Sequence, residues 1–390
     1  MIIRRPFWEQ LIEKAWKQRT IIWLMGVRRV GKTSLCQSLP DIEYFDCELP
    51  LVRQLLENPV AFLTSKKGKR LVFDEIHRLD NPSEILKIAA DYYPDIFIIA
   101  TGSSMLGASA KFKDTLTGRK REVWLIPLLL SEIGDFGNEN ISHRLLFGGL
   151  PSFFASESFP EDAFKEWSDA YWAKDIQDMF SVGKRSSFHK FTELLLVQSG
   201  GQFEASAFAA PCKVSRQTIA NYLAILEVTF VVHIIRPYST RKANEIIMAP
   251  KVYGFDTGFV CYAKGWYELR KEDLGILWEH CVLNELHAHL QTHTIHYWRD
   301  KQGHEIDFVL RNRGSKELTL IECKFNSSSL SRDRNTDTVL KTNIVSFRQH
   351  YPHGKNYVVT SDAIEPFERH YDGTTVTVLN VYDLIEKLRI

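Results

Sequence analysis

The chain has 390 residues, of which 44% are hydrophobic and 25% are charged, an ordinary composition for a globular protein long enough to form several domains. Lysine and arginine number 49 and aspartate and glutamate 48, so the formal net charge is +1. This balance excludes a histone-like binder that is basic over its whole surface and a protein dominated by an acidic tail, but it leaves room for local basic patches.

The apolar runs and the cysteines predict a cytoplasmic protein. Residues 1–20 contain no apolar core of a signal peptide. No apolar stretch approaches the ~20 residues that a membrane-spanning helix needs. The six cysteines are scattered without a Cys-x-x-Cys pair, which is typical of reduced thiols. We therefore expect no membrane partner.

Four zones of different composition predict an α/β protein. Residues 1–135 alternate short apolar runs with amphipathic stretches, which indicates a parallel sheet covered by helices. Residues 136–185 are expected to form a helical lid or linker, residues 186–260 a winged-helix-like segment, and residues 272–390 a second α/β domain. The strands expected in the first zone are 20–25, 42–47, 70–73, 95–101 and 121–125.

The first functional motif is a phosphate-binding loop. The run from Gly26 to Thr33 matches G-x-x-x-x-G-K-[ST] in full, after an expected strand and before a helix that begins at Lys32. Backbone N–H groups around Gly26 and Gly31 can wrap phosphates, and Lys32 supplies a positive charge. The Thr33 hydroxyl is the expected Mg²⁺ ligand, and Ser34 follows it. We expect ATP to bind here; a glycine turn with a chance lysine is the alternative that this setting disfavours.

A pair of acids ends the strand at 70–73. Next to a phosphate-binding loop, Asp74 is expected to hold Mg²⁺ and Glu75 to activate the attacking water. The following strand ends in Thr101, Gly102 and Ser103. Either the Thr101 or the Ser103 hydroxyl is a candidate to contact the γ-phosphate and position the water, with an ordinary strand end as the alternative.

The order of these motifs resembles that of bacterial and archaeal AAA+-type (AAA_14-like) ATPases with a DUF4143 C-terminal region. The likeness covers nearly the whole chain and rests on GVRRVGKTS, DEIHRL, ATGSS, LTGR at 116–119, PLLLSEI at 127–133 and GGLP at 148–151. It implies a P-loop AAA+-like fold for residues 1–135, ATP and Mg²⁺ as ligands, and a homo-oligomeric ring, most often a hexamer. It also implies that Arg119 is an arginine finger for a neighbouring subunit; a surface arginine is the alternative. His77 stands where the family more often has Gln, and we assign it no catalytic role.

A superfamily-2 helicase also combines D-E-x-H with G-K-T. Such a helicase needs a second RecA-like domain with an arginine-rich motif. The rest of the chain offers no phosphate-facing G-R-x-x-R element, which disfavours this alternative.

A helix-turn-helix is expected in the middle of the chain. Residues 214–226 predict a helix capped by Ser215, with an apolar stripe at helical spacing. A helix at 203–210 precedes it, and a strand at 231–235 would open a wing, as in the winged-helix-like segment that the resemblance implies. The side chains expected to contact DNA are Arg216, Gln217, Asn221, Arg236, Arg241 and Lys242. A packing module without DNA contact is the alternative.

Acidic residues near the C-terminus resemble a PD-(D/E)xK nuclease site. The members are Glu285, Asp307, Glu322 and Lys324. Strand alternation places Glu322 and Lys324 on one face. Asp307 and Glu322 are candidates for a second Mg²⁺ site, Glu285 is a supporting acid from the helix at 277–290, and Lys324 would orient or deprotonate water. The resemblance implies a restriction-endonuclease-like fold; cleavage, DNA binding without cleavage and a structural role remain open.

Six histidines between His280 and His304 raise the question of a zinc site. The segment has no H-E-x-x-H motif and no companion cysteine spacing, so a solvated helix end is favoured.

Together these patterns predict an ATP-hydrolysing ring ATPase that binds and remodels branched or double-stranded DNA, for example by junction branch migration. A second hypothesis is an NTP-driven regulatory switch with a protein partner, in a defence or toxin–antitoxin setting, whose nuclease-like domain is inactive. A third is a self-contained ATP-dependent nuclease.

Overall fold

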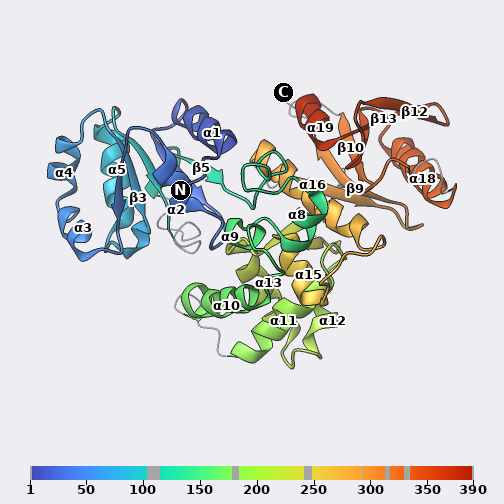
Figure 1. Ribbon diagram of the computed structural model, residues 1–390, viewed down its shortest axis with the longest axis horizontal. Helices are drawn as coiled ribbons and strands as arrows, with labels where there is room; N and C mark the ends of the chain where they lie inside the picture. Colours follow the sequence, from blue (N-terminus) through green and yellow to red (C-terminus); the bar gives the residue numbers. More distant parts are fainter. Residues whose placement is uncertain are drawn as a thin grey trace.

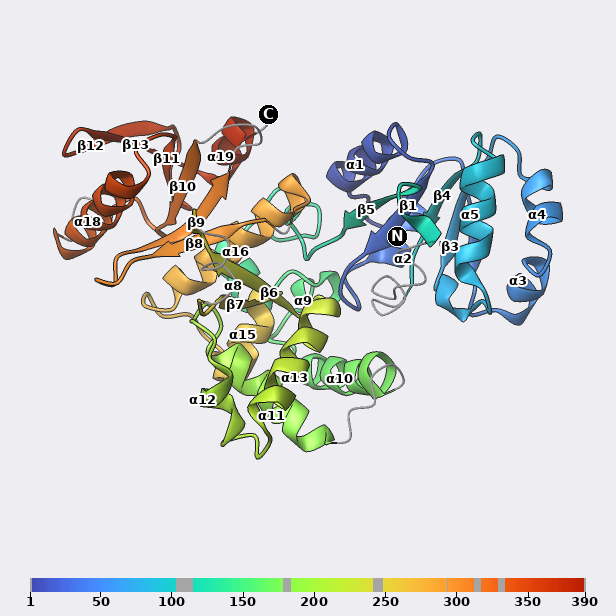
Figure 2. The ribbon, with the colours of Figure 1, turned by 180° about the vertical axis from the view of Figure 1, so that it is seen from behind.

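The computed structural model describes residues 2–102, 115–177, 184–240, 248–292, 294–311, 317–328 and 334–388. Ser103, Arg241 and Lys242 therefore lie outside the described residues. Figures 1 and 2 show a blue N-terminal lobe, a mostly green helical lobe and an orange-to-red C-terminal lobe. We call these the N-terminal, middle and C-terminal lobes.

The N-terminal lobe is built on a parallel sheet of five strands in the order β2-β3-β4-β1-β5. All five predicted strands are confirmed to within two residues. The apolar runs of the three central strands, β3, β4 and β1, are typical of strands that are covered on both faces. The strands are β1 (Ile21–Met25), β2 (Ile42–Asp46), β3 (Arg70–Asp74), β4 (Phe97–Ala100) and β5 (Lys120–Trp124).

Helices cover both faces of this sheet. Ile22 and Leu24 share one apolar core with α1 and α2, whereas Ile21 and Trp23 share another with α4 and α5, because alternate side chains of a strand point to opposite faces. The helices of the lobe are α1 (Pro6–Trp16), α2 (Lys32–Ser38), α3 (Pro50–Leu55), α4 (Pro59–Ser65), α5 (Pro82–Tyr92) and the 3₁₀ turn η1 (Ile76–Arg78).

The middle lobe contains the helix-turn-helix. Ser215 caps α13 as predicted, since its hydroxyl accepts a hydrogen bond from the Thr218 N–H at 3.1 Å. A π-helix, η2, continues α10. The elements are α8 (Ile141–Phe147), α9 (Pro151–Phe154), α10 (Glu161–Tyr171), η2 (Trp172–Gln177), α11 (Arg185–Val197), α12 (Ala205–Ala209), α13 (Arg216–Val228) and α15 (Thr257–Lys264).

The strand that was expected to open a wing belongs instead to the C-terminal sheet. Strand β6 (Val232–Pro237) pairs antiparallel with β7 (Lys251–Gly254) and parallel with β8 (His296–Arg299). Most of β6 is buried, which is the physical reason that it does not project as a wing. One sheet therefore crosses the expected boundary between 186–260 and 272–390.

The C-terminal lobe is built on this mixed eight-stranded sheet, in the order β12-β13-β11-β10-β9-β8-β6-β7. Helix α18 shares a core with one face, and α16 and α19 share a core with the other. The remaining elements are α16 (Leu274–Leu290), β9 (Glu305–Arg311), β10 (Leu318–Cys323), α18 (Arg334–His350), β11 (Asn356–Val359), β12 (Phe367–Tyr371), β13 (Thr374–Leu379) and α19 (Val381–Leu388).

Helix α16 ties the C-terminal lobe to the N-terminal sheet. Just beyond its end, the Gln291 amide hydrogen-bonds both backbone groups of Trp124 in edge strand β5, at 2.8 and 3.2 Å. Within the helix, Glu285 accepts a hydrogen bond from the Leu130 N–H at 2.7 Å. The two lobes are therefore joined by buried polar contacts as well as by a shared apolar core.

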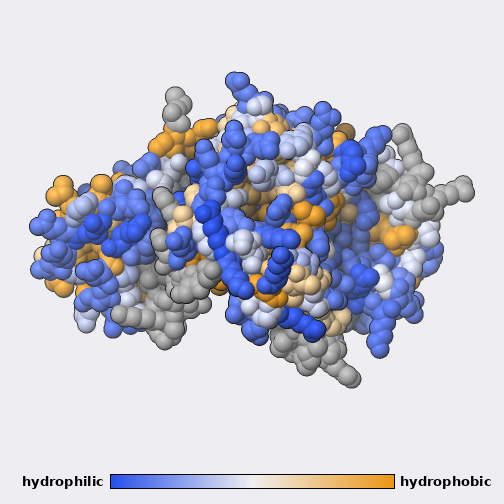
Figure 3. Space-filling model, turned by 90° about the horizontal axis from the view of Figure 1, so that it is seen from below, coloured by the Kyte–Doolittle hydropathy of each residue, from blue (hydrophilic) through white to orange (hydrophobic). Residues whose placement is uncertain are grey.

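The surface is largely hydrophilic, with separate apolar patches. One lies at the end of the molecule that carries α3 and α4 (Figure 3), where Leu51 is 79% exposed and Val60 54% exposed. Among the described residues, no helix combines the length and the apolar character that crossing a bilayer requires.

Candidate functional site

The phosphate-binding loop follows β1, and the Lys32 side chain hydrogen-bonds to carbonyl groups of the loop itself. Gly26 has a φ of +149°, and a Cβ there would lie 2.3 Å from the Leu125 carbonyl oxygen, so only glycine fits. Gly31, with a φ of +99°, precedes α2. The Lys32 Nζ donates to the carbonyls of Gly26 at 2.8 Å and Val27 at 3.2 Å. Burial lowers the pKa of Lys32, although nearby carboxylates oppose this shift.

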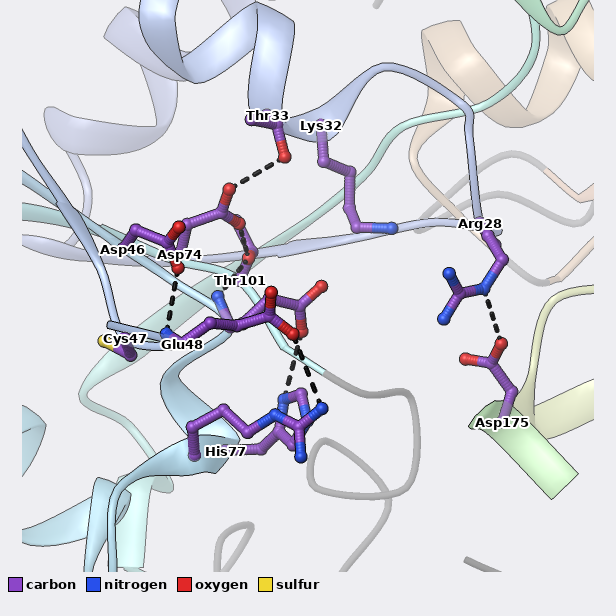
Figure 4. Close-up of polar contacts among 12 residues, drawn as sticks. Arg28, Lys32, Thr33, Asp46, Cys47, Glu48, Asp74, His77, Thr101 and Asp175 are labelled. Carbon is purple, nitrogen blue, oxygen red and sulfur yellow. Dashed lines mark hydrogen bonds and ion pairs between the residues drawn. The ribbon is translucent and has the colours of Figure 1, made fainter. Parts of the chain in front are cut away.

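Asp74 is the centre of the site (Figure 4). The Thr33 Oγ1 donates to its Oδ2 at 2.7 Å, and the hydroxyls of Tyr44 and Thr101 also donate to this carboxylate. The three donors come from α2, β2 and the end of β4, which meet at the carboxyl edge of the sheet. The structure therefore brings the predicted Thr33, Asp74 and Thr101 together and adds Tyr44, which the motifs did not indicate.

Glu75 follows Asp74 and is held in the left-handed region, with a φ of 51°. Its N–H donates to the Thr101 Oγ1 at 3.1 Å, and its Oε2 lies 3.1 Å from the His77 Nδ1. Burial raises the pKa of Glu75, but the hydrogen bond and charge of His77, with Lys32 and Arg28, outweigh it and leave the pKa lowered. Glu75 is thus kept as a carboxylate, and His77 has a contact that the sequence did not predict.

These residues fit a nucleotide with Mg²⁺. A hydroxyl and a carboxylate that already share a hydrogen bond, Thr33 and Asp74, are the hard oxygen donors that Mg²⁺ prefers. The Lys32 ammonium, which here satisfies two carbonyls of its own loop, is the group that phosphate oxygens would attract. Ser34 is exposed at the first turn of α2.

Arg119 and Arg28 are held by ion pairs that bear on the nucleotide site. The Arg119 Nε lies 2.6 Å from the Asp91 Oδ1, and the side chains of both are about one-third exposed. Within one chain, Arg119 is thus paired away from the loop. The second, Arg28 of the loop itself, donates through Nε to the Asp175 Oδ2 of η2 at 2.8 Å. No motif pointed to Asp175, because it lies 147 positions further along the chain.

The candidate DNA-contacting residues that the structure describes lie on the surface. Arg216, Gln217 and Asn221 are exposed on α13, and the Gln217 Nε2 donates to the Asn221 Oδ1 at 3.1 Å. Arg236 is exposed on β6 and so does not sit on a separate wing. The helix face is accessible, but its only cation among these residues is Arg216.

The nuclease-like candidates meet on the C-terminal sheet. The Asp307 Oδ2 accepts a hydrogen bond from the Cys323 N–H at 2.8 Å, which joins β9 to β10. The Lys324 Nζ lies 3.0 Å from the Glu322 Oε2, as the predicted shared face requires. The other oxygen of Glu322, Oε1, is buried without a hydrogen-bond partner. Burial and then Asp307 raise the pKa of Glu322 to about 8.

The structure does not bring Glu285 to this cluster. Glu285 faces the N-terminal lobe, where it accepts from Leu130 and lies 3.5 Å from the His289 Nε2. Glu279, six residues earlier on α16, lies at the cluster where Glu285 was expected. Its Oε1 lies 3.2 Å from the Nζ of Lys251 on β7, and burial followed by Asp307 raises its pKa to about 7. A six-residue step turns a helix by about 240°, so the two acids point to different faces.

Zinc finds no support in the described histidines. Among the described residues, no group of three or more His, Cys, Asp and Glu side chains is arranged to hold a metal ion.

Three family models match successive parts of the chain. The AAA domain matches residues 18–134, a domain of unknown function (DUF8612) matches residues 138–270, and another domain of unknown function (DUF4143) matches residues 274–382. The N-terminal lobe is accordingly an AAA domain, which implies nucleotide binding.

Similar chains occur in bacteria and archaea. An uncharacterized protein of Mycobacterium tuberculosis is 27% identical over 328 residues, covering 80% of this chain and 73% of its own. One of Methanocaldococcus jannaschii is 24% identical over 349 residues, covering 80% of this chain and 76% of its own.

Among solved structures, the Aeropyrum pernix Orc1 protein in complex with DNA has 13% identity and a TM-score of 0.26, covering 67% of this chain and 91% of its own. Cdc6p of Pyrobaculum aerophilum has 10% identity and a TM-score of 0.26, covering 67% and 94%. Scores of this size do not establish a common overall fold.

Proposed function

We propose that this protein is an ATP-hydrolysing ring ATPase that binds and remodels branched or double-stranded DNA, for example by moving a junction. The observation that carries ATP hydrolysis is the convergence of the Thr33 and Thr101 hydroxyls on the Asp74 carboxylate beside the Lys32 loop, within an AAA domain, with Glu75 held next to it through its N–H bond to Thr101. These residues come from helix α2 and from the ends of the two neighbouring parallel strands β3 and β4.

Each side chain then has a defined task. Lys32 leaves the loop carbonyls for the phosphates, and Thr33 and Asp74 hold Mg²⁺, which neutralises phosphate charge when bound. Glu75, with its lowered pKa, is the acceptor for a proton of the attacking water. The Thr101 hydroxyl accepts a hydrogen bond from the Glu75 N–H and donates one to Asp74, so it fixes the backbone that carries the Glu75 carboxylate beside Asp74. Ser103 remains a candidate for contacting the γ-phosphate.

The ring is proposed because Arg119 pairs with Asp91 and contacts none of the described residues of its own phosphate-binding site. Its partial exposure and its partner Asp91 at the surface leave it able to reach a neighbouring subunit. Head-to-tail contacts of this kind close into rings, and a hexamer is our proposal.

A mixing experiment tests the finger. Arg119→Ala and Lys32→Ala chains should each hydrolyse ATP poorly as pure oligomers, but mixtures should regain activity at interfaces that pair an intact loop with an intact arginine. No recovery in any mixture would remove the finger assignment while leaving the ATP site itself intact.

The DNA-remodelling part is tested by ATP turnover with duplex, single-stranded, forked and four-way-junction DNA. We expect stimulation that falls steeply with salt, because phosphate contacts release counterions. Arg216 and Arg236, together with Arg241 and Lys242, are the proposed contacts. Absence of stimulation by any DNA would favour the regulatory switch with a protein partner. ATP turnover that survives Lys32→Ala would refute the ATPase assignment.

A second candidate activity is Mg²⁺-dependent DNA cleavage by the C-terminal lobe. The element order α16, β8, β9, β10, α18, β11 supports a restriction-endonuclease-like core, because β8, β9 and β10 pair antiparallel and β11 pairs parallel with β10. The buried Glu322 Oε1 without a hydrogen-bond partner is the observation that favours a cation there. Asp307 and Glu322 would hold it, and Lys324 would orient water.

Cleavage should disappear in Asp307→Asn and persist in Glu365→Gln, an exposed carboxylate of the same lobe. If wild-type protein binds DNA but never cuts it in Mg²⁺ or Mn²⁺, the lobe is a DNA-binding module without nuclease chemistry.

A further inference from the structure

The middle lobe places a carboxylate, that of Asp175, against the phosphate-binding loop. Asp175 on η2 receives a hydrogen bond from the Arg28 Nε at 2.8 Å, and the two side chains are only 29% and 19% exposed for Arg28 and Asp175. In Figure 4 this pair lies on the side toward which the Lys32 side chain extends. The middle lobe therefore contributes a carboxylate beside the place expected for phosphates.

A second contact holds the same loop residue. The Nε1 of Trp167, a buried residue of α10, donates to the Arg28 carbonyl at 3.0 Å. Asp175 and Trp167 are thus fixed to opposite ends of one residue, its guanidinium and its backbone. Asp175 lies on a π-helix, a rare form that is frequently found at functional sites.

The electrostatics of the site connect this pair with the proposed catalytic groups. The Arg28 charge contributes to lowering the pKa of both Lys32 and Glu75, and the Asp175 charge opposes the lowering at Lys32. A guanidinium that can bind a dianionic phosphate through two N–H groups prefers it to a single carboxylate contact.

We propose that Arg28 is a phosphate-binding residue that exchanges Asp175 for the terminal phosphate of ATP, so that the Arg28–Asp175 contact between the loop and the middle lobe forms only when that phosphate is absent. This inference rests on the proposed ATP site and adds to it a positioning residue and the carboxylate that competes for it. Competition of this kind is reciprocal. A change that weakens the Arg28–Asp175 ion pair should raise the affinity for ATP, and ATP binding should weaken that ion pair.

The neighbouring pair supplies a matched control. Arg29 lies 3.9 Å from Glu166 of α10, and their side chains are 42% and 72% exposed. Glu166→Gln removes a carboxylate of the same lobe that faces the same loop, but its pair with Arg29 is long and exposed, so we expect it to contribute little.

The experiment is titration of the full chain with a non-hydrolysable ATP analogue and with ADP. Asp175→Asn should tighten the analogue by about 2- to 5-fold, the scale of a partly exposed ion pair, and change ADP by less than twofold. Arg28→Ala should weaken the analogue more than ADP, and the double variant should match Arg28→Ala. Glu166→Gln should change neither ligand.

Hydrogen exchange provides a readout that does not depend on affinity. Saturating analogue should speed exchange in residues 161–177 of the wild type but not of Arg28→Ala, whereas ADP should leave it unchanged. The exchange between Asp175 and phosphate would be overturned if Asp175→Asn changed the affinities for the analogue and for ADP by the same factor. Weaker analogue binding in that variant would overturn it as well. A wild-type chain that binds neither ligand would instead refute the proposed ATP site.

Discussion

Replacing Glu132 by glutamine should strongly destabilise the N-terminal lobe. The Arg5 Nε and Nη2 donate to the two Glu132 oxygens at 2.8 and 2.6 Å, and both side chains are 4% exposed. The same carboxylate accepts the Leu129 N–H at 2.9 Å, and the Arg5 Nη1 donates to the Val30 carbonyl of the phosphate-binding loop at 3.2 Å. The pair therefore fastens the N-terminal segment, the loop and residues 129–132 together.

The expected magnitude follows from burial. Glutamine keeps the shape and an acceptor oxygen but leaves the Arg5 cation unpaired, which costs about 3–5 kcal/mol in the free energy of unfolding. A double replacement, Arg5→Met with Glu132→Leu, buries no charge and should recover most of that loss. Asp169→Asn is the matched control, because the Asp169–Arg185 pair has a similar N–O distance of 2.8 Å but side chains that are 56% exposed. It should cost under about 1 kcal/mol.

The assay is urea unfolding followed by tryptophan fluorescence. The first transition is assigned to the N-terminal lobe by its shift to higher urea when nucleotide is bound. Our reasoning about this pair is refuted if Glu132→Gln costs less than about 1 kcal/mol, or if the double variant is no more stable than the single one. A secondary result is weaker ATP-analogue binding in Glu132→Gln, since the Val30 carbonyl loses a restrained donor.

Three further outcomes are expected. Burial lowers the pKa of His280 to about 4, so the folded chain binds fewer protons than the unfolded chain between about pH 4 and 6.5. The free energy of unfolding should therefore fall by at most roughly 3 kcal/mol as the pH drops through that window. His280→Asn should flatten this pH profile, as measured by urea unfolding. Gly148→Ala should cost about 2–4 kcal/mol by thermal melting, because its Cβ would lie 2.0 Å from the Asp256 Oδ1, whereas Gly265→Ala, with open space around it, should cost about 1–2 kcal/mol. Arg216→Ala should reduce the salt dependence of DNA binding by about one counterion, as measured by fluorescence anisotropy across salt concentrations; an unchanged slope would exclude a phosphate contact.

The features that the sequence predicted well are local ones. The strands that carry the phosphate-binding loop and Asp74 are short continuous apolar runs, and their ends coincide with polar residues whose chemistry is recognisable. The capped helix α13 is likewise determined by residues three apart. Such signals need no knowledge of the rest of the chain.

The features that could not be predicted depend on distant contacts. Helix α16 is buried on nearly all sides, so its apolar pattern does not indicate which acid faces the C-terminal sheet. Glu279 and Glu285 are equivalent in sequence terms, and only packing against β7 and against residue 130 distinguishes them. The same holds for β6, whose apolar alternation fits a wing and a sheet equally well, and for Asp175, which no motif connects with the loop.

The contacts made by α16 have a consequence for how the protein is produced. Trp124 and Leu130 obtain their hydrogen-bond partners from residues 167 and 155 positions later, on Gln291 and Glu285. At about 5–20 residues per second, the ribosome makes the Gln291 partner roughly 8–33 s after Trp124. During that interval the edge of the nucleotide-binding sheet must be hydrated or shielded by a chaperone. A chain cut before residue 274 would therefore carry its phosphate-binding loop on a sheet whose edge strand β5 lacks the Gln291 contacts.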